Sequence, residues 1–303
     1  MIEHLVLSGG ANIGFAFFGT LKQLILDNYL QIENIKTIHA TSIGACIASF
    51  ITLGYDLETV ETYLIDRPWK DIYKFDFQTV IEAFQEGGFF DIESIKQTAK
   101  PLLLGKDLSL DITLEEYYEY NKKELHFYTT EYSQLSLVDI SYKTHPKWKL
   151  VEAIYASCCL PVLMRPLYKD DEFYVDGAVL LNYPLIKALE TIEDSNTILG
   201  IYHDTNKDIS NLRKAKPFND EPSNYRLMEY MMSILLKMWT IVKHEKKQKE
   251  KEHLFQIGIK CNTNALYIIK AFECKEERIQ LLELGKNSAL EYLKSIQNIY
   301  EKV

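Results

Sequence analysis

The chain has 303 residues, of which 47% are hydrophobic and 25% are charged, which is ordinary for a soluble globular protein with one large α/β domain. Its net charge of −9 argues against a nucleic-acid-binding protein, because no broad basic surface is available to neutralise phosphates. Five cysteines without a Cys-x-x-Cys pair indicate neither a disulfide framework nor a zinc site, and they favour a reducing, intracellular compartment.

A glycine-rich loop follows the first expected strand. Residues 4–7 form a short apolar run typical of a buried strand, and residues 15–27 are expected to form a helix. Between them lies Ser8-Gly9-Gly10-Ala11-Asn12-Ile13-Gly14, in which glycines would let a ligand oxygen approach the main chain. This layout is typical of an anion site built from backbone N–H groups, and also of an ordinary tight turn. It fits no nucleotide-binding pattern, because both Gly-Lys-Ser/Thr and the Gly-x-Gly-x-x-Gly spacing are absent.

The second unit has the same layout around a serine. Residues 36–40 are expected to form a strand and residues 43–53 a helix, with Thr41-Ser42 at the junction and Gly44 just beyond it. A serine on such a turn is held at the end of the sheet with its hydroxyl exposed, and the following helix N-terminus favours negative charge beside it. The pattern therefore suggests that Ser42 is a nucleophile. From these residues alone, a Thr-Ser N-cap on a buried helix is an equally good interpretation.

The rest of the chain is predicted to mix helices and strands. Helices are expected at residues 56–66, 76–85, 114–120, 149–157, 224–243 and 276–296, with others after Asp91 and up to Glu190. Strands are expected at residues 125–131, 135–143, 173–175, 197–202 and 254–259, and residues 204–224 are expected to form a loop. Because no repeat or linker divides the chain, one domain over residues 1–303 is expected. Its motifs lie within residues 5–204, and its helical part at 223–303 packs on them.

An aspartate stands directly after one of these strands. Asp176 follows the strand at 173–175 and precedes Gly177, so its side chain should project from the end of the sheet. Taken alone, an Asp-Gly pair is more typical of a turn.

Together, these segments resemble the patatin-like phospholipase family in order and spacing. The resemblance rests on the glycine loop with Gly14 and Gly19, on Thr41-Ser42-Ile43-Gly44-Ala45, and above all on residues 156–184. That last stretch runs from Ala156-Ser157-Cys158-Cys159-Leu160-Pro161 through Pro166 to Tyr174-Val175-Asp176-Gly177-Ala178 and Asn182-Tyr183-Pro184.

The resemblance implies a lipid acyl hydrolase with a Ser–Asp dyad on a three-layer α/β/α fold with a mainly parallel central sheet. Ser42 matches the family's nucleophile and Asp176 its base, and they would cleave an acyl ester of a lipid or phospholipid through an acyl-enzyme intermediate. The backbone N–H groups of Gly9, Gly10 and Ala11 match its oxyanion hole. Gly14, Gly44 and Gly177 match supporting positions. No metal or organic cofactor is expected.

The sequence departs from the family pattern in three places. Ala40 replaces the usual glycine before the serine turn, where a methyl group should still fit. Ala11 replaces the third glycine of the loop, and its N–H stays available if the loop does not need a positive φ there. Ile13 stands where the family usually has Arg or Lys, which bears on head-group preference and on catalytic efficiency.

Two other functions compete with this interpretation. An α/β-hydrolase triad could be formed by Ser42, Asp176 and His203, which is the chain order that such enzymes use. Alternatively, the chain could be a catalytically weak or inactive module that binds lipid or protein. His39, three positions before the nucleophile, is expected to lie in the core or on a sheet face.

The location expected for the protein is the cytoplasm. No apolar run is long enough to span a bilayer, and the N-terminus lacks the basic segment of a signal peptide. Contact with a membrane would therefore be peripheral. We expect the loop at 204–224, or the Met-rich helix after it, to border the acyl groove, because Met side chains adapt to flexible chains.

Overall fold

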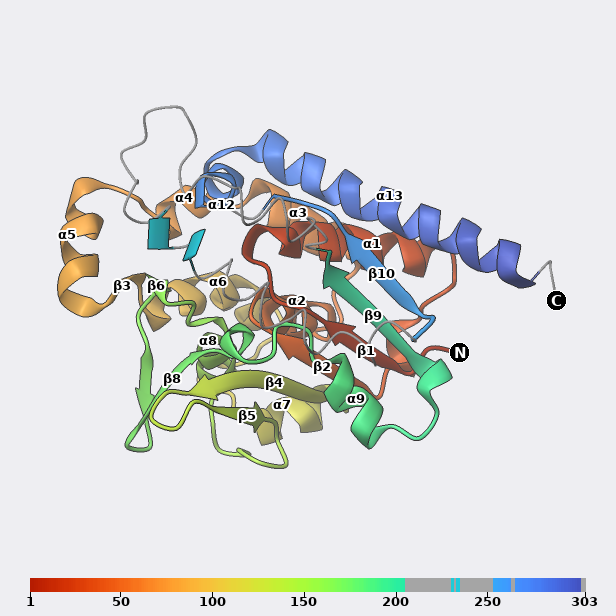
Figure 1. The fold of residues 1–303 in the computed structure, drawn as a ribbon, viewed down its shortest axis with the longest axis horizontal. Helices are drawn as coiled ribbons and strands as arrows, with labels where there is room; N and C mark the ends of the chain where they lie inside the picture. The colour runs from red at the N-terminus through yellow and green to blue at the C-terminus, as the bar shows by residue number, and fades with distance from the viewer. Residues whose placement is uncertain (205–229, 232, 235–252, 263–264, 301–303) are drawn as a thin grey trace.

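The computed structural model describes residues 1–204, 230–231, 233–234, 253–262 and 265–300 (Figure 1). An eight-stranded sheet forms its centre, in the order β10-β9-β1-β2-β4-β8-β7, with β5 paired to β4 off this path. The strands are β1 (His4–Leu7), β2 (Thr37–Thr41), β4 (Glu124–Glu131), β5 (Ser136–Ile140), β7 (Leu167–Lys169), β8 (Glu172–Asp176), β9 (Ile198–His203) and β10 (Gln256–Ile259). The neighbours from β10 to β4 are parallel, whereas β5, β7 and β8 are joined by antiparallel pairings.

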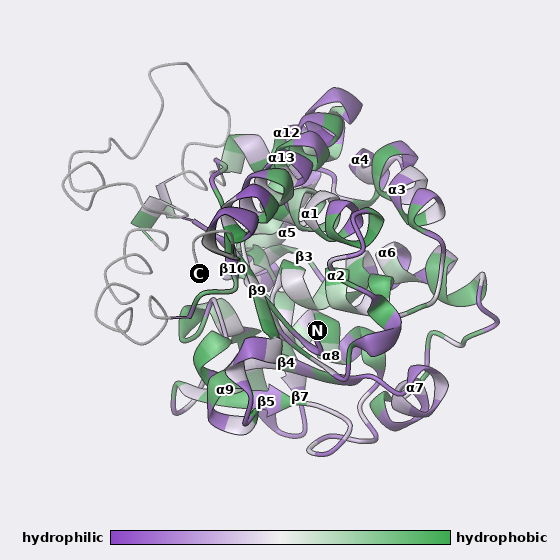
Figure 2. Ribbon diagram, turned by 90° about the vertical axis from the view of Figure 1, so that its right-hand side faces the viewer, coloured by the Kyte–Doolittle hydropathy of each residue, from purple (hydrophilic) through white to green (hydrophobic). Residues whose placement is uncertain are grey.

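Helices cover both faces of this sheet (Figures 1 and 2). The side chains of Leu5 and Leu7 pack on the face that carries most of the helices, and Val6 between them packs on the opposite face with α9 (Leu185–Thr191). Burial on both faces explains why the strand is an unbroken apolar run. The other helices are α1 (Gly14–Leu26), α2 (Ile43–Ile51), α3 (Leu57–Asp66), α4 (Trp69–Ile72), α5 (Phe77–Glu86), α6 (Ile92–Leu104), α7 (Leu114–Asn121), α8 (Leu150–Cys158), α12 (Ala265–Glu273) and α13 (Lys275–Tyr300). The predicted three-layer fold with a mainly parallel sheet is confirmed.

The register of the sheet sets the position of the site. Thr41, the last residue of β2, pairs with Tyr128 of the parallel strand β4. Ser42 comes next and is therefore level with Thr129, whose antiparallel partner is Asp176. Because β8 runs against β4, the aspartate reaches this level from the opposite direction. Residues 134 positions apart in the sequence are thus placed in one row.

The last long helix packs directly on the helix that follows the glycine loop. A Cβ at Gly285 of α13 would lie 1.9 Å from the carbonyl oxygen of Ala16, and a Cβ at Gly19 of α1 would lie 2.2 Å from that of Leu282. The hydroxyl of Thr20 also donates to the carbonyl of Gly285 at 2.9 Å. The crossing of α1 and α13 therefore depends on two glycines that allow backbone-to-backbone approach.

We expect Gly285→Val to force the two helices apart and lower the free energy of unfolding by about 2–4 kcal/mol, since overpacking at a backbone contact has no flexible side chain to yield. Lys286→Val is the matched control, because it adds the same side chain at the next position, where the Lys286 side chain is half-exposed. Urea unfolding of both variants and the wild type measures the difference. Equal stability of the two variants would contradict the close crossing.

Most predicted elements are confirmed, and the omissions are short or atypical. The antiparallel pairing of residues 125–131 with 135–143 appears as β4 and β5. Five elements were not predicted from the sequence: α4, α12, β7 and a separate pair formed by β3 (Gly88–Phe90) and β6 (Val162–Met164). Apart from the nine-residue α12, these segments have three or four residues and carry too little periodicity to be recognised. The predicted loop at 204–224 and most of the helix at 224–243 lie outside the described residues, and the one-domain division stays a prediction.

Candidate active site

The turn before α2 holds Ser42 in an unusual backbone conformation. Its φ of 55° and ψ of −128° are those of neither a helix nor a strand. The side chain makes no capping hydrogen bond to α2, although serine is a common N-cap. Instead its amide N–H donates to the hydroxyl of Ser157 at 2.9 Å. The N-cap interpretation of Thr41-Ser42 is therefore wrong for the serine side chain, which is directed elsewhere.

The hydroxyl of Ser42 donates to Asp176. The distance from Oγ to the carboxylate Oδ2 is 2.6 Å, and the other oxygen, Oδ1, accepts from the amide of Ala178 at 2.8 Å. Asp176 is fully buried and Ser42 is 8% exposed. Burial raises the pKa of Asp176 to about 7, and the hydrogen bonds from Ser42 and Ala178 oppose this shift only in part. Near neutral pH this carboxylate can therefore both accept and return a proton.

The glycine loop lies against the serine. A Cβ at Gly9 would be 2.5 Å from Oδ1 of Asn182 and 3.0 Å from Cβ of Ser42, so a larger residue would displace these side chains. The amide of Gly9 donates to the carbonyl oxygen of Asn182 at 2.9 Å, whereas in the described part of the chain the amides of Gly10 and Ala11 have no hydrogen-bond acceptor. Ala11 has a φ of 53°, so the loop does use a positive φ at the position where the sequence has alanine. That conformation costs roughly 1–2 kcal/mol for an L-residue, and among the described residues it leaves the N–H of Ala11 without an acceptor.

The supporting glycines allow other close approaches around the site. A Cβ at Gly44 would lie 2.7 Å from the carbonyl oxygen of Leu7, and one at Gly177 would lie 2.1 Å from that of Tyr128. A Cβ at Gly14 would meet the side chain of Ile43 at 2.4 Å. These contacts bring the start of α2 close to β1 and the glycine loop, and the end of β8 close to β4.

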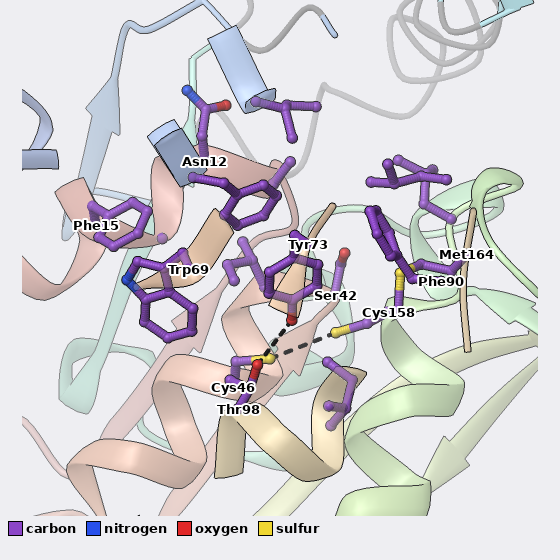
Figure 3. Close-up of a pocket in the computed structure, with 18 of the residues that line it drawn as sticks. Asn12, Phe15, Ser42, Cys46, Trp69, Tyr73, Phe90, Thr98, Cys158 and Met164 are labelled. Atoms are coloured by element: carbon purple, nitrogen blue, oxygen red, sulfur yellow. Dashed lines mark hydrogen bonds between the residues drawn. The ribbon is translucent and has the colours of Figure 1, made fainter. Parts of the chain in front are cut away.

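A largely apolar pocket opens beside Ser42 (Figure 3). It encloses about 870 Å³ of space outside protein atoms, with open solvent at its mouth included. Its wall is almost wholly apolar, which suits an aliphatic chain better than a polar ligand. Helices α1, α2, α4, α6 and α12 contribute to its walls, as do the β3 and β6 strands. The lining includes Phe15, Ile47, Phe50, Trp69, Tyr73, Phe90, Ile95, Leu163, Met164, Ile268 and Phe272.

A few polar side-chain atoms interrupt this apolar wall. The hydroxyl groups of Tyr73 and Thr98 are hydrogen-bonded at 2.9 Å, and the Sγ atoms of Cys46 and Cys158 lie 3.8 Å apart (Figure 3). All five cysteines are free thiols.

His203 lies next to the glycine loop but is engaged elsewhere. Its Nε2 is 3.0 Å from the carbonyl oxygen of Cys261, and its backbone N–H donates to the hydroxyl of Ser8 at 2.9 Å. No imidazole stands between Ser42 and Asp176, because these two side chains bond directly. His39 is buried on the sheet as predicted, with Nδ1 2.8 Å from the Tyr128 hydroxyl.

The two other departures from the family pattern, Ala40 and Ile13, are both buried, and neither has a positive φ. Ala40 is fully buried in β2, and Ile13 is fully buried in the main hydrophobic core. An apolar side chain therefore packs where a basic residue is usual.

Comparison with known proteins adds to this geometry. The model of the patatin-like phospholipase family matches residues 5–189. The chain belongs to the patatin-like phospholipase family. This patatin-like chain is 28% identical to the uncharacterized protein R571 of Acanthamoeba polyphaga mimivirus over 241 residues, which cover 78% of this chain and 76% of that protein. It is 26% identical to the probable lipid hydrolase 463L of Invertebrate iridescent virus 6 over 190 residues, or 62% of this chain and 63% of that protein.

A solved structure shares the fold of this patatin-like chain. VipD from Legionella pneumophila superposes with a TM-score of 0.54 at 17% sequence identity, covering 97% of this chain and 67% of that one. At this identity the likeness shows the fold alone.

Other site features were not predicted for this patatin-like chain. The sequence analysis did not assign a role to Ser157, although it lies in the most specific stretch of the resemblance. It also missed Ile268 and Phe272, which reach the pocket from a helix that was not predicted. Among the residues that the structure describes, no three His, Cys, Asp or Glu side chains gather as metal ligands, and no helix is both long and apolar enough to cross a bilayer.

Proposed function

We propose that this protein is a lipid acyl hydrolase, a carboxylic-ester hydrolase of the phospholipase A type that uses Ser42 as nucleophile and Asp176 as base. The observation that carries the proposal is the 2.6 Å hydrogen bond from Ser42 Oγ to the buried carboxylate at the edge of an apolar pocket. Membership of the patatin-like phospholipase family supports lipid hydrolysis. A viral relative named as a probable lipid hydrolase supports it too.

The reaction follows from these groups. The acyl chain of the ester lies in the apolar pocket, and Ser42 Oγ attacks the ester carbonyl while its proton passes directly to Asp176. Asp176 then gives that proton to the departing alkoxide, which leaves an acyl ester on Ser42. A water molecule attacks the acyl-enzyme while Asp176 takes its proton. Asp176 then returns that proton to Ser42 Oγ as the free fatty acid is released.

The oxyanion of each tetrahedral intermediate needs donors that are not already engaged. Among the described residues, the amides of Gly10 and Ala11 have no acceptor, and they follow Gly9 in the loop that approaches Ser42. The amide of Gly9 is bonded to the carbonyl oxygen of Asn182. We therefore narrow the oxyanion hole from Gly9-Gly10-Ala11 to the last two amides, and assign Gly9 to close approach. A well-placed donor of this kind typically contributes about 2.7–4 kcal/mol to transition-state stabilisation.

The geometry favours the dyad over the triad with His203. A triad histidine would have to bond both the serine hydroxyl and the aspartate, but Ser42 and Asp176 bond one another and Nε2 of His203 faces a backbone carbonyl. The alternative of an inactive binding module predicts that the folded wild type forms no covalent adduct and hydrolyses no acyl ester. A cytoplasmic location with peripheral membrane contact remains part of this proposal.

Covalent labelling tests the nucleophile independently of the natural substrate. We expect a long-chain alkyl fluorophosphonate to form one phosphonyl ester, with loss of fluoride, on the peptide that contains Ser42. Ser42→Ala should give no adduct. Ser49→Ala should label like the wild type, because Ser49 is a buried serine of α2, the helix after Ser42, and its hydroxyl donates to the carbonyl of Ala45. Intact-mass and peptide analysis measure the result.

Two outcomes of the labelling would count against the proposal. An adduct that persists in Ser42→Ala would remove this serine as nucleophile. A folded wild type that forms no adduct and hydrolyses no acyl ester would favour the inactive binding module.

A further inference from the structure

A buried side chain holds the amide, rather than the hydroxyl, of Ser42. The N–H of Ser42 donates to Oγ of Ser157 at 2.9 Å, and that hydroxyl donates to the carbonyl oxygen of Tyr128 at 2.7 Å. Ser157 is fully buried near the end of α8, so bulk water does not compete for either bond. The two bonds connect the start of α2 to β4.

The backbone of Ser42 needs a connection of this kind. Conformations such as its φ of 55° and ψ of −128° cost of order 1–3 kcal/mol and persist only where the surroundings enforce them. A serine before a helix often stabilises the turn with its own hydroxyl, but the hydroxyl of Ser42 is bonded to Asp176. The amide is therefore the group through which the protein can hold this turn.

The same strand also holds the aspartate. Thr129 pairs with Asp176 across β4 and β8, and the hydroxyl of Thr130 donates to the carbonyl oxygen of Asp176 at 3.2 Å. Gly177 lies against the carbonyl of Tyr128, the group that also accepts from Ser157. Three consecutive residues of β4 thus fix the position of the aspartate. The hydroxyl of Ser157 connects the amide of Ser42 to Tyr128, the first of these three residues.

We propose that Ser157 is a positioning residue that keeps the Ser42 turn in register with Asp176 and thereby sets the contact between Ser42 Oγ and the carboxylate. Ser157 touches Ser42 only through the backbone amide, so it acts on the reaction through the nucleophile. This inference rests on the proposed function. Without the Ser157 hydroxyl, a buried N–H and a buried carbonyl lose a partner, and the turn can relax toward an ordinary backbone conformation.

Steady-state kinetics of Ser157→Ala test the proposal. We expect kcat to fall about 10- to 100-fold with KM changed less than about twofold, since a displacement near 1 Å at the reacting atoms can cost about 100-fold. The control Ser49→Ala removes an equally buried serine hydroxyl from α2 and should keep kcat within about twofold of the wild type. Ser157→Thr keeps the hydroxyl and should restore most of kcat.

The pH profile gives a readout that a purely structural role would not change. The hydrogen bond from Ser42 lowers the pKa of Asp176, so loss of the contact should move the acid limb of kcat/KM to higher pH in Ser157→Ala. Ser49→Ala should retain the wild-type midpoint. A Ser157→Ala profile with an unchanged midpoint and unchanged kcat would overturn the proposal.

Hydrogen exchange at the Ser42 amide decides the question without any catalysis. Fragmentation that resolves single residues should show faster exchange of this N–H in Ser157→Ala than in the wild type and Ser49→Ala. Unchanged exchange overturns the positioning role, even if kcat falls. If the folded wild type hydrolyses no ester, the proposed function fails, and faster exchange in Ser157→Ala still supports Ser157 as the residue that holds the turn.

Discussion

Replacing Ser42 by Ala or Asp176 by Asn should lower hydrolysis of acyl esters by about 10⁴-fold or more, because a nucleophile and its base act as a unit. The serine supplies the attacking oxygen, and the carboxylate is the group that receives its proton across 2.6 Å. Both variants keep the volume of the site nearly unchanged. Fatty acid released from phospholipid vesicles and from a soluble p-nitrophenyl acyl ester measures the loss.

Two comparisons make this experiment decisive. His203→Ala should retain activity, since its ring nitrogen Nε2 faces the carbonyl of Cys261 rather than the dyad. Loss of activity in His203→Ala as large as the loss in Asp176→Asn would instead favour the triad. Because Ser42 and Asp176 act together in the same step, the double variant should be no worse than the more impaired single variant.

The pH dependence of the wild type should show an acid limb with a midpoint near 7. Burial raises the pKa of Asp176 to about 7, and only the ionised carboxylate can accept the serine proton. Below the midpoint, kcat/KM should fall about tenfold per pH unit, which amounts to about 100-fold at pH 5. A profile that is flat from pH 5 to pH 8 would contradict Asp176 as the base.

The raised pKa of Asp176 increases activity as pH rises but lowers the stability of the folded state. In the unfolded chain Asp176 titrates near 3.8, so between about pH 4 and pH 7 the folded state retains a proton that the unfolded state has lost. The free energy of unfolding contributed by this group therefore falls as pH rises through that window, and it stays low above pH 7. Asp176→Asn should melt a few °C above the wild type at pH 8 and close to it at pH 4. Thermal unfolding at the two pH values measures this difference.

Much of the fold could be predicted because its elements carry strong local patterns. The apolar run of β1 and the small, apolar residues of α2 gave the two strand–turn–helix units, and the register then placed their turns together. The segment from Ala265 to Glu273 is also rich in apolar residues, but it was assigned no element, and α12 was missed with the pocket wall that it forms. Short strands such as β3 and β6 are set by a long-range pairing rather than by their own residues.

The candidate site could be predicted only in part. The serine turn was visible from local sequence, but the approach of Asp176 depends on an antiparallel pairing with β4 that local pattern does not reveal. The resemblance to the family supplied that link. It did not indicate that the Gly9 amide is bonded to a backbone carbonyl, nor that Ala11 takes a positive φ, because neither feature depends on the identity of a side chain.

The crossing of α1 and α13 has a consequence for the smallest working piece of this protein. Every motif residue lies before position 204, yet α1 begins at the end of the glycine loop and rests on α13 through Gly19 and Gly285. A shortened chain ending near residue 204 would keep the full set of signature residues and lose the support behind the loop that carries the free amides. Part of the pocket wall would be lost with Ile268 and Phe272. Sequence motifs therefore mark where the chemistry occurs, but they underestimate how much chain is needed to hold it.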